Sequence, residues 1–156
     1  MTELDFMDRF SECLTLVAKA ASELKRLHGS EVVLVGGAAV VVYTNGLFHS
    51  GDFDLITAAD ESFLRILLET GFHEDTGPGK LKNRYYHPDQ PGFSVQLVSG
   101  PLFDGRTDRL RLATVEVTAG AGLRLPPVED LIADRLAQYA AGPTDPSRLE
   151  QARALF

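Results

Sequence analysis

The amino-acid sequence predicts an α/β (α+β) fold: a mixed β-sheet with an N-terminal helix and two C-terminal helices packed on it. Three observations support this class. The chain begins with a helical apolar periodicity, continues with short apolar or alternating segments, and ends in helical patterns. Its 156 residues suit a single domain (1–156), with an N-terminal helix (1–28), a sheet core (30–125) and C-terminal helices (127–156).

The N-terminal segment is predicted to be an amphipathic helix that ends at Gly29. Basic residues occupy its last turn, where the helix dipole favours positive charge, and glycine is a common residue just after a helix. The apolar residues recur at spacings of three and four and therefore share one face: Phe6, Phe10, Cys13, Leu14, Val17, Ala21, Leu24 and Leu27.

Two adjacent strands are predicted next, separated by a helix. Residues 31–35 are β-branched and almost wholly apolar, which is typical of a strand buried on both faces. The pair Gly36-Gly37 ends this strand, and residues 38–43 are predicted to continue as a helix. Residues 52–56 alternate polar and apolar side chains, as in a strand with two chemically different faces.

The rest of the chain adds helices and two strand pairs. Asp60 is expected to cap a helix that has Leu68 on its buried side, and Leu136 is expected on the buried side of the helix that follows Pro127. The predicted segments are a helix from 60 to 70, strands over 81–87 and 93–98, a hairpin of 114–118 and 122–125, and helices over 127–141 and 145–156.

Composition and charge narrow the class of protein. Fifteen basic against 22 acidic residues give a formal net charge of −7, which disfavours non-specific binding to nucleic acid. No apolar run has the length of a membrane span, and the acidic N-terminus lacks the features of a signal peptide. Cys13 is the only cysteine, so an intrachain disulfide is excluded. We therefore expect a cytoplasmic protein with no membrane partner.

Asp52 and Asp54 are the strongest candidates for a functional site. In a strand, residues i and i+2 point to the same face, so these carboxylates project together, with Cα atoms about 6–7 Å apart. Two ionised carboxylates at this spacing favour a cation, and hard oxygen ligands suit Mg²⁺. A bare Asp-x-Asp also occurs at solvated strand ends, and that alternative remains open.

Gly36 and Gly37 strengthen the hypothesis of a site. Glycines between a buried strand and a helix let backbone N–H groups approach an anion, and the helix N-terminus adds a favourable potential. Taken alone, the pair is more simply a tight turn. Together with the carboxylates on the adjacent strand, it predicts a site for a nucleoside triphosphate. Neither a Walker loop nor a Rossmann fingerprint is present.

These residues resemble the nucleotidyltransferase superfamily of the DNA polymerase beta type. The resemblance rests on residues 36–39 (GGAA) and 50–54 (SGDFD). A further resemblance, to small nucleotidyltransferase-like proteins akin to the abortive-infection antitoxin-system group, rests on residues 100–102 (GPL), 127–136 (PVEDLIADRL) and 149–152 (LEQA).

The resemblance implies a minimal nucleotidyltransferase fold and a Mg²⁺-dependent enzyme. Such an enzyme transfers a nucleoside monophosphate from a nucleoside triphosphate to a hydroxyl acceptor. In the implied mechanism two Mg²⁺ ions bind Asp52, Asp54 and the triphosphate, and orient the hydroxyl for in-line attack on the α-phosphate. Gly36, Gly37 and Ser50 are the implied nucleotide-binding residues. The implied partners are the nucleotide, an unidentified acceptor and a toxin or other protein.

The sequence departs from the superfamily pattern at two positions. A neighbouring strand usually supplies a third carboxylate, and the matching residue is Gln96, which we place with the nucleotide-binding residues; Asp89 or Asp104 would have to substitute from a loop. An amide brings no charge and accepts no proton. Phe48 stands where many relatives have an arginine. The alternative to an enzyme is therefore a catalytically degenerate protein that binds a nucleotide or a protein partner.

Three weaker candidates have simple structural explanations. Lys80, Lys82 and Arg84 alternate along a predicted strand, and a solvated strand face is the preferred interpretation. Arg135 either reaches a triphosphate or pairs with an acid, and we favour pairing. His49, close in sequence to the two aspartates, is interpreted as a loop residue.

Overall fold

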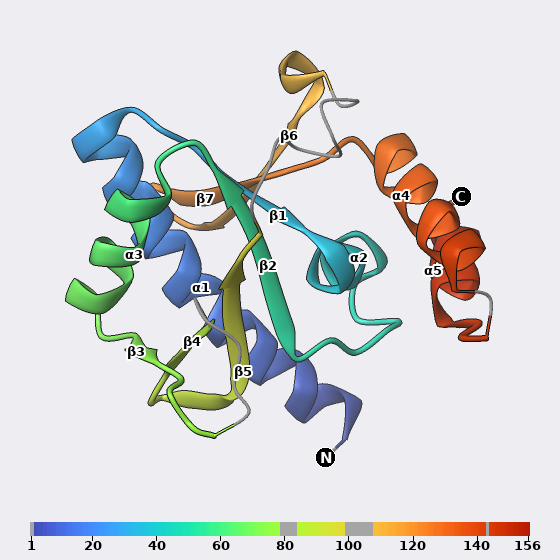
Figure 1. Ribbon diagram of the computed structural model, residues 1–156, viewed down its shortest axis with the longest axis horizontal. Helices are drawn as coiled ribbons and strands as arrows, with labels where there is room; N and C mark the ends of the chain where they lie inside the picture. The colour runs from blue at the N-terminus through green and yellow to red at the C-terminus, as the bar shows by residue number, and fades with distance from the viewer. Residues whose placement is uncertain (1, 79–83, 99–107, 143) are drawn as a thin grey trace.

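The computed structural model describes residues 2–78, 84–98, 108–142 and 144–156 (Figure 1). In this part of the chain the elements are α1 (Glu3–His28), β1 (Val32–Val35), α2 (Gly36–Thr44), β2 (Asp52–Thr57), α3 (Asp60–Glu69), β3 (His73–Glu74), β4 (Arg84–His87), β5 (Gln90–Leu97), the 3-10 helix η2 (Arg109–Arg111), β6 (Ala113–Thr118), β7 (Ala121–Leu125), α4 (Val128–Ala141) and α5 (Ser147–Leu155).

The strands form one mixed sheet in the order β3-β4-β5-β2-β1-β7-β6. β1 pairs antiparallel with β2 and parallel with β7, and β2 pairs parallel with β5. The pairs β3–β4, β4–β5 and β6–β7 are antiparallel. The α/β fold class is therefore confirmed. The two strands predicted to be adjacent lie side by side in the middle of the sheet, with Val35 opposite Asp54.

The two faces of the central strands differ in chemistry because successive side chains point to opposite sides. Phe53 and Leu55 of β2 are buried in the main core with the apolar stripe of α1 and with Phe63 of α3. Asp52 and Asp54 point to the opposite side, which we call the Asp54 face. A smaller apolar cluster lies there: Val33, Val35, Ile56 and Leu112.

Helix α1 confirms the predicted N-terminal helix. Thr2 and Asp5 form a reciprocal capping box at its start, and Gly29 ends it in a left-handed conformation with φ of 70°. The predicted stripe is buried as far as Leu24, whereas Leu27 is half exposed near the helix end. No helix in the described residues, α1 included, is long and apolar enough to cross a membrane.

The C-terminal helices pack on α2 and on each other, and α2 packs on β1 and β2. Figure 1 shows α4 and α5 beyond α2, on the side away from α3. The Tyr43 hydroxyl of α2 donates to the Pro126 carbonyl over 2.6 Å, just before α4 begins. These contacts hold α4 close to the ends of β1 and β2.

Three predictions about helix ends and faces are wrong. Asp60 is the first residue of α3 and does not cap it; Ala59 occupies the cap position, and its N–H donates to the Thr57 hydroxyl. Leu68 is exposed. On α4, Leu136 is 42% exposed whereas Arg135 is only 6% exposed. Helix α4 packs on α2 with Arg135 turned inward. The next residue, Leu136, therefore faces solvent.

The strand boundaries also differ from the sequence analysis. β5 begins at Gln90, three residues earlier than expected, so the turn from His87 is tighter. The short strand β3 and the 3-10 helix η2 were not predicted, because two- and three-residue elements carry no periodicity. Residues 79–83 and 99–107 lie outside the described chain, and with them Lys80, Lys82, Asp104 and the 100–102 segment.

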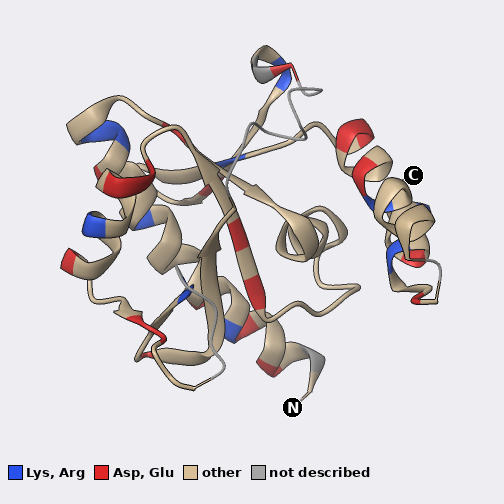
Figure 2. Cartoon of the chain, in the orientation of Figure 1, with Lys and Arg blue, Asp and Glu red and all other residues tan. Residues whose placement is uncertain are grey.

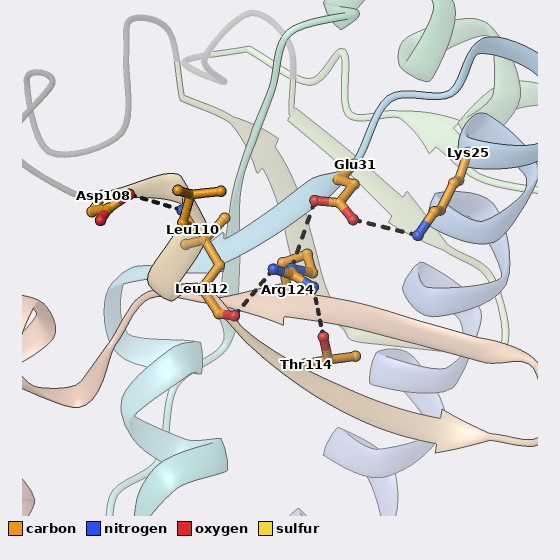
Figure 3. Close-up of polar contacts among 7 residues, drawn as sticks. All are labelled: Lys25, Glu31, Asp108, Leu110, Leu112, Thr114 and Arg124. Carbon is orange, nitrogen blue, oxygen red and sulfur yellow. Dashed lines mark hydrogen bonds and ion pairs between the residues drawn. The ribbon is translucent and has the colours of Figure 1, made fainter.

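A polar cluster ties β7 to its neighbours at the far end of the sheet (Figure 3). The Arg124 guanidinium donates to the Thr114 hydroxyl over 2.8 Å and to the Leu112 carbonyl over 3.1 Å. It also lies 3.6 Å from the Glu31 carboxylate, which in turn pairs with Lys25 of α1 at 3.4 Å. Arg124 thus joins β7, β6 and the start of β1.

We expect Arg124→Met to lower the free energy of unfolding by about 1–3 kcal/mol, since the substitution removes two hydrogen bonds and leaves a partly buried carbonyl without its donor. Urea unfolding measures this loss. Arg26→Gln is the matched control, because Arg26 pairs only with Glu23 on the exposed surface of α1 in the described structure. Equal stability of the two variants would contradict a structural role for the Arg124 cluster.

Candidate functional site

Asp52 and Asp54 lie together on the Asp54 face with polar residues of β5 beside them. The parallel register places Ser94 next to Asp52 and Gln96 next to Asp54. Arg84 of β4 is in turn the register partner of Gln96. Figure 2 shows the two acidic positions on β2 in the middle of the sheet. The strand pairing therefore brings the predicted carboxylates and Gln96 to one surface.

Gly36 and Gly37 lie directly against this surface. A Cβ atom on Gly36 would be 2.7 Å from Asp54 Oδ2, and one on Gly37 would be 2.9 Å from the Ser50 hydroxyl. Gly36 also has a φ of 69°, a conformation that side chains disfavour. Because position 36 is a glycine, the N-terminus of α2 lies closer to the Asp54 carboxylate than a residue with a side chain would allow. The start of α2 is therefore adjacent to Asp54 at Gly36 and to Ser50 at Gly37.

Asp52 is held by two side chains, one from the adjacent strand β5 and one from β4 beyond it. Arg84 Nη2 lies 2.9 Å from Asp52 Oδ1, and the Ser94 hydroxyl donates to the same oxygen. Among the described contacts, Oδ2 is the oxygen left for another ligand. The Ser50 hydroxyl lies against the backbone of Asp52, donating to its carbonyl over 3.2 Å. The expectation that Arg84 points to solvent is therefore wrong, because it pairs across β5 with an acid of the site.

Asp54 is less exposed than Asp52, and its surroundings disfavour the ionised carboxylate. Burial raises the pKa of its carboxyl group, and the nearby charge of Asp52 raises it further. Arg135 and Arg84 act in the opposite direction, with Arg135 the stronger of the two. An ionised Asp54 is thus destabilised in the folded chain until a further cation approaches.

Arg135 comes to the site from α4. Its guanidinium donates to Asp134 over 2.7 and 3.2 Å, which fits the pairing that the sequence favoured. The same side chain is buried and acts on Asp54. The pairing of Arg135 with an acid is therefore confirmed, whereas its contact with a triphosphate stays a prediction. The sequence showed Arg135 only as a basic residue at the edge of an apolar stripe. The orientation of α4 determines where its side chain points.

The donor set fits a divalent cation with a small number of protein ligands. Within the described ranges, no group of three or more His, Cys, Asp or Glu residues lies close enough together to hold a metal. Asp52 and Asp54 supply two carboxylates, and Mg²⁺ typically takes one or two, with water and phosphate completing the shell. Mutual repulsion in the pair is what a bound cation would relieve.

A pocket of about 470 Å³ opens beside Asp52 on the side away from α4. Asp75, Arg84, Tyr86 and Ser94 also line it. The Tyr86 ring stacks on His73, with ring centroids 5.7 Å apart and an angle of 27° between planes. A volume of this size suits a small molecule. Asp75 was not predicted, because only the sheet register brings it to Asp52.

The remaining candidates have other contacts. His49 stacks on Phe6 of α1 with ring centroids 3.9 Å apart, as a packed loop residue does. Asp89 lies in the β4–β5 turn, where its N–H donates to His87. Cys13 is buried, and burial raises the pKa of its thiol to about 12, so it is chemically inert.

Comparisons with known proteins identify the fold. No family model matches the chain, and the comparison with curated proteins finds no match. Solved structures do match. An antigenic nucleotidyltransferase-like protein from Paracoccidioides brasiliensis aligns with a TM-score of 0.70 and 16% identity, over 95% of this chain and 75% of that one.

Two structures of ANT(2'')-Ia give the same result. The complex with adenylyl-2''-tobramycin aligns with a TM-score of 0.61 and 14% identity, over 93% of this chain and 86% of that one. The solution structure of this antibiotic-resistance factor aligns with a TM-score of 0.60 and 15% identity, over 93% and 81%. The chain therefore has the nucleotidyltransferase fold that the sequence predicted. The resemblance to the antitoxin-system group remains a prediction.

Gly36→Ala is expected to displace the Asp54 carboxylate, since a methyl group there meets Oδ2 at 2.7 Å. Gly29→Ala is the matched control: its φ is 70°, so the backbone strain is alike, but no atom lies within 4 Å of the new methyl group. We expect a loss of about 1 kcal/mol for the control and about 1 kcal/mol more for Gly36→Ala, measured by urea unfolding. Equal losses would show that the close approach is unimportant.

The raised pKa of Asp54 predicts a pH-dependent stability. Protonation of Asp54 favours the fold, and this contribution is present below the ordinary value of 3.8 and is lost as the pH rises through the higher native pKa. The permanently neutral Asp54→Asn should therefore be more stable than the wild type at pH 7, and the difference should vanish at about pH 3.

Urea unfolding across this pH range measures the difference. Asp145→Asn is the control of opposite sign, because hydrogen bonds from Ser147 lower the pKa of Asp145. That variant should lose stability at pH 7 and approach the wild type in acid. An Asp54→Asn protein that is less stable than the wild type at pH 7 would contradict this electrostatic picture.

Proposed function

We propose that this chain is a Mg²⁺-dependent nucleotidyltransferase that transfers a nucleoside monophosphate from a nucleoside triphosphate to a hydroxyl group. The observation that carries the proposal is the close approach of Gly36 to the Asp54 carboxylate. It brings a helix N-terminus, which attracts phosphate, to within contact distance of a carboxylate pair that favours a cation. A nucleoside triphosphate bound with Mg²⁺ requires both features together.

The charged side chains have separate roles in this proposal. Asp54 and Oδ2 of Asp52 would hold Mg²⁺, which when bound neutralises the phosphates and orients the α-phosphate for attack. The N-terminus of α2 at Gly36 and Gly37 receives phosphate oxygens, and the Ser50 hydroxyl borders the same place. Arg135 adds a positive charge from α4, and its burial makes this charge act over a short, poorly screened distance.

The pocket beside Asp52 is the place for the acceptor. Residues of β4 and β5 line it beside Asp52, whereas Arg135 comes from α4, so an acceptor there would approach from the β4–β5 side. The acceptor oxygen bonds to the α-phosphorus, the bond from this phosphorus to the bridging oxygen breaks, and pyrophosphate leaves. The hydroxyl proton passes to water, because Gln96 has no basic atom and Arg84 holds Asp52.

The acceptor in this proposal is a small hydroxylated molecule. The pocket volume of about 470 Å³ suits one. ANT(2'')-Ia has been solved with adenylyl-2''-tobramycin, a hydroxylated small molecule that carries a nucleotide. The Tyr86 ring, supported by His73, offers a flat surface against which a ring can pack. We infer the class of acceptor from these features and leave its identity to screening.

A catalytically degenerate, nucleotide-binding protein is the second candidate. Gln96 is the observation that favours it, since it lies beside Asp54 where an active superfamily member has its third carboxylate. This candidate predicts the same nucleotide binding as the enzyme and differs only in turnover. Binding and transfer therefore have to be measured separately.

Calorimetric titration with ATP, GTP, CTP and UTP tests the binding step. We expect saturable binding of at least one nucleotide that requires Mg²⁺ and is lost in the Asp52→Asn, Asp54→Asn double variant. Arg135→Lys keeps the charge and loses the fork of donors, so it should weaken binding by about tenfold. Arg148→Lys on α5, which pairs with Asp145, is the matched control and should bind as the wild type does.

The outcomes separate the two candidates. Release of labelled pyrophosphate with a screened acceptor supports the enzyme, whereas Mg²⁺-dependent binding without release supports the degenerate protein. No binding of any nucleotide to the folded chain would contradict both.

A further inference from the structure

Arg84 occupies a position in the site that no sequence pattern assigns to it. Its backbone pairs with Gln96 on β5, and Gln96 pairs with Asp54 on β2, so the three residues form one row across the sheet. From the end of this row the guanidinium reaches over β5 to Asp52 Oδ1, at 2.9 Å. The guanidinium therefore contacts Asp52 from the far side of β5.

The site keeps a negative charge before any metal binds, because Arg135 is itself paired with Asp134. Asp52 and Asp54 contribute two negative charges, and Arg84 and Arg135 are the two cations that act on Asp54 in the described structure. The superfamily resemblance implies a third carboxylate in this place and two divalent ions on the set. Here the inward positions of β5 next to the aspartates are Ser94 and Gln96, which bring no charge.

We propose that Arg84 takes the place of one of the two metal ions, so that the site binds a single divalent cation, on Asp54 and Oδ2 of Asp52. This inference rests on the proposed function and concerns how the same site is charged. The Arg84 guanidinium neutralises Oδ1 of Asp52 on the pocket side, whereas Oδ2 and Asp54 remain on the nucleotide side. In this arrangement the amide of Gln96 stands in place of the third carboxylate. Arg84 stands in place of the ion that this carboxylate would help to hold.

The arrangement also assigns Arg84 a positioning role at the acceptor. It lines the pocket together with Ser94, next to the place where a hydroxyl would approach in this proposal. A guanidinium donates hydrogen bonds and positive charge, but it does not acidify a hydroxyl as a metal ion does. Arg84 therefore positions and neutralises without activating the nucleophile.

Titration of the nucleotide-free chain with Mn²⁺, followed by the electron paramagnetic resonance signal of free Mn²⁺, counts the bound ions without depending on activity. We expect one ion per wild-type chain. Arg84→Gln removes the competing charge and should bind that ion about tenfold more tightly. Arg84→Gln combined with Gln96→Glu restores a third carboxylate and should bind two ions.

Two control variants show whether the number and affinity of bound Mn²⁺ ions depend on the charge at position 84. Arg84→Lys keeps the charge and should match the wild type in number of ions and in affinity within about threefold. Arg26→Gln makes the same change of net charge on the exposed surface of α1 and should behave as the wild type does. Circular dichroism confirms that each variant is folded, and if the double variant does not fold, the affinity of Arg84→Gln alone decides.

Each result distinguishes this inference from the proposed function. Two ions in the wild type, or weaker binding by Arg84→Gln, would overturn the role of Arg84 and leave the nucleotide site intact. No Mn²⁺ bound to the wild type would overturn both. One ion in the wild type and two in the double variant would support the exchange of an ion for an arginine.

Discussion

The contact between the start of α2 and the Asp54 carboxylate is the constraint on which the site depends. β1 and β2 pair so that Val35 lies opposite Asp54, and the chain turns into α2 at the next residue. Only a residue without a side chain fits there, because a Cβ on Gly36 would be 2.7 Å from the carboxylate. A helix N-terminus and an acid are thereby held together by the central strand pair of the sheet, which is buried on its other side.

The electrostatics of the site follow from the position of Asp54 beside the start of α2. Two ionised carboxylates this close together, one of them partly buried, destabilise the fold unless cations lie near them. The fold supplies two such cations, Arg84 from β4 and Arg135 from α4. The two arginines act differently. Arg84 is bonded to Asp52 directly, whereas Arg135 is bonded to Asp134 and acts on Asp54 through space. Arg84 therefore neutralises Asp52, whereas Arg135 shares its charge with Asp134, and the site remains able to accept one more cation at Asp54.

Local patterns predict the elements well and their surroundings less well. The apolar spacing along α1 and the alternation in β2 each have a local physical cause, and both elements are confirmed. The helix predicted to follow Gly36-Gly37 is also present, but it begins at Gly36 itself. The placement of Arg84 and the rotation of α4, which buries Arg135 and exposes Leu136, depend on strand register and on packing against α2. No local pattern encodes these, so the sequence identified the acids of the site and missed how its cations reach them.

A crystal structure of the chain with Mn²⁺ and α,β-methylene-ATP tests the central claim most directly, because the anomalous signal of manganese locates the ion independently of the nucleotide. The account predicts manganese between Asp54 and Oδ2 of Asp52, with the triphosphate over Gly36 and Gly37. Nucleotide bound elsewhere on the chain, or manganese bound away from the two aspartates, would contradict it.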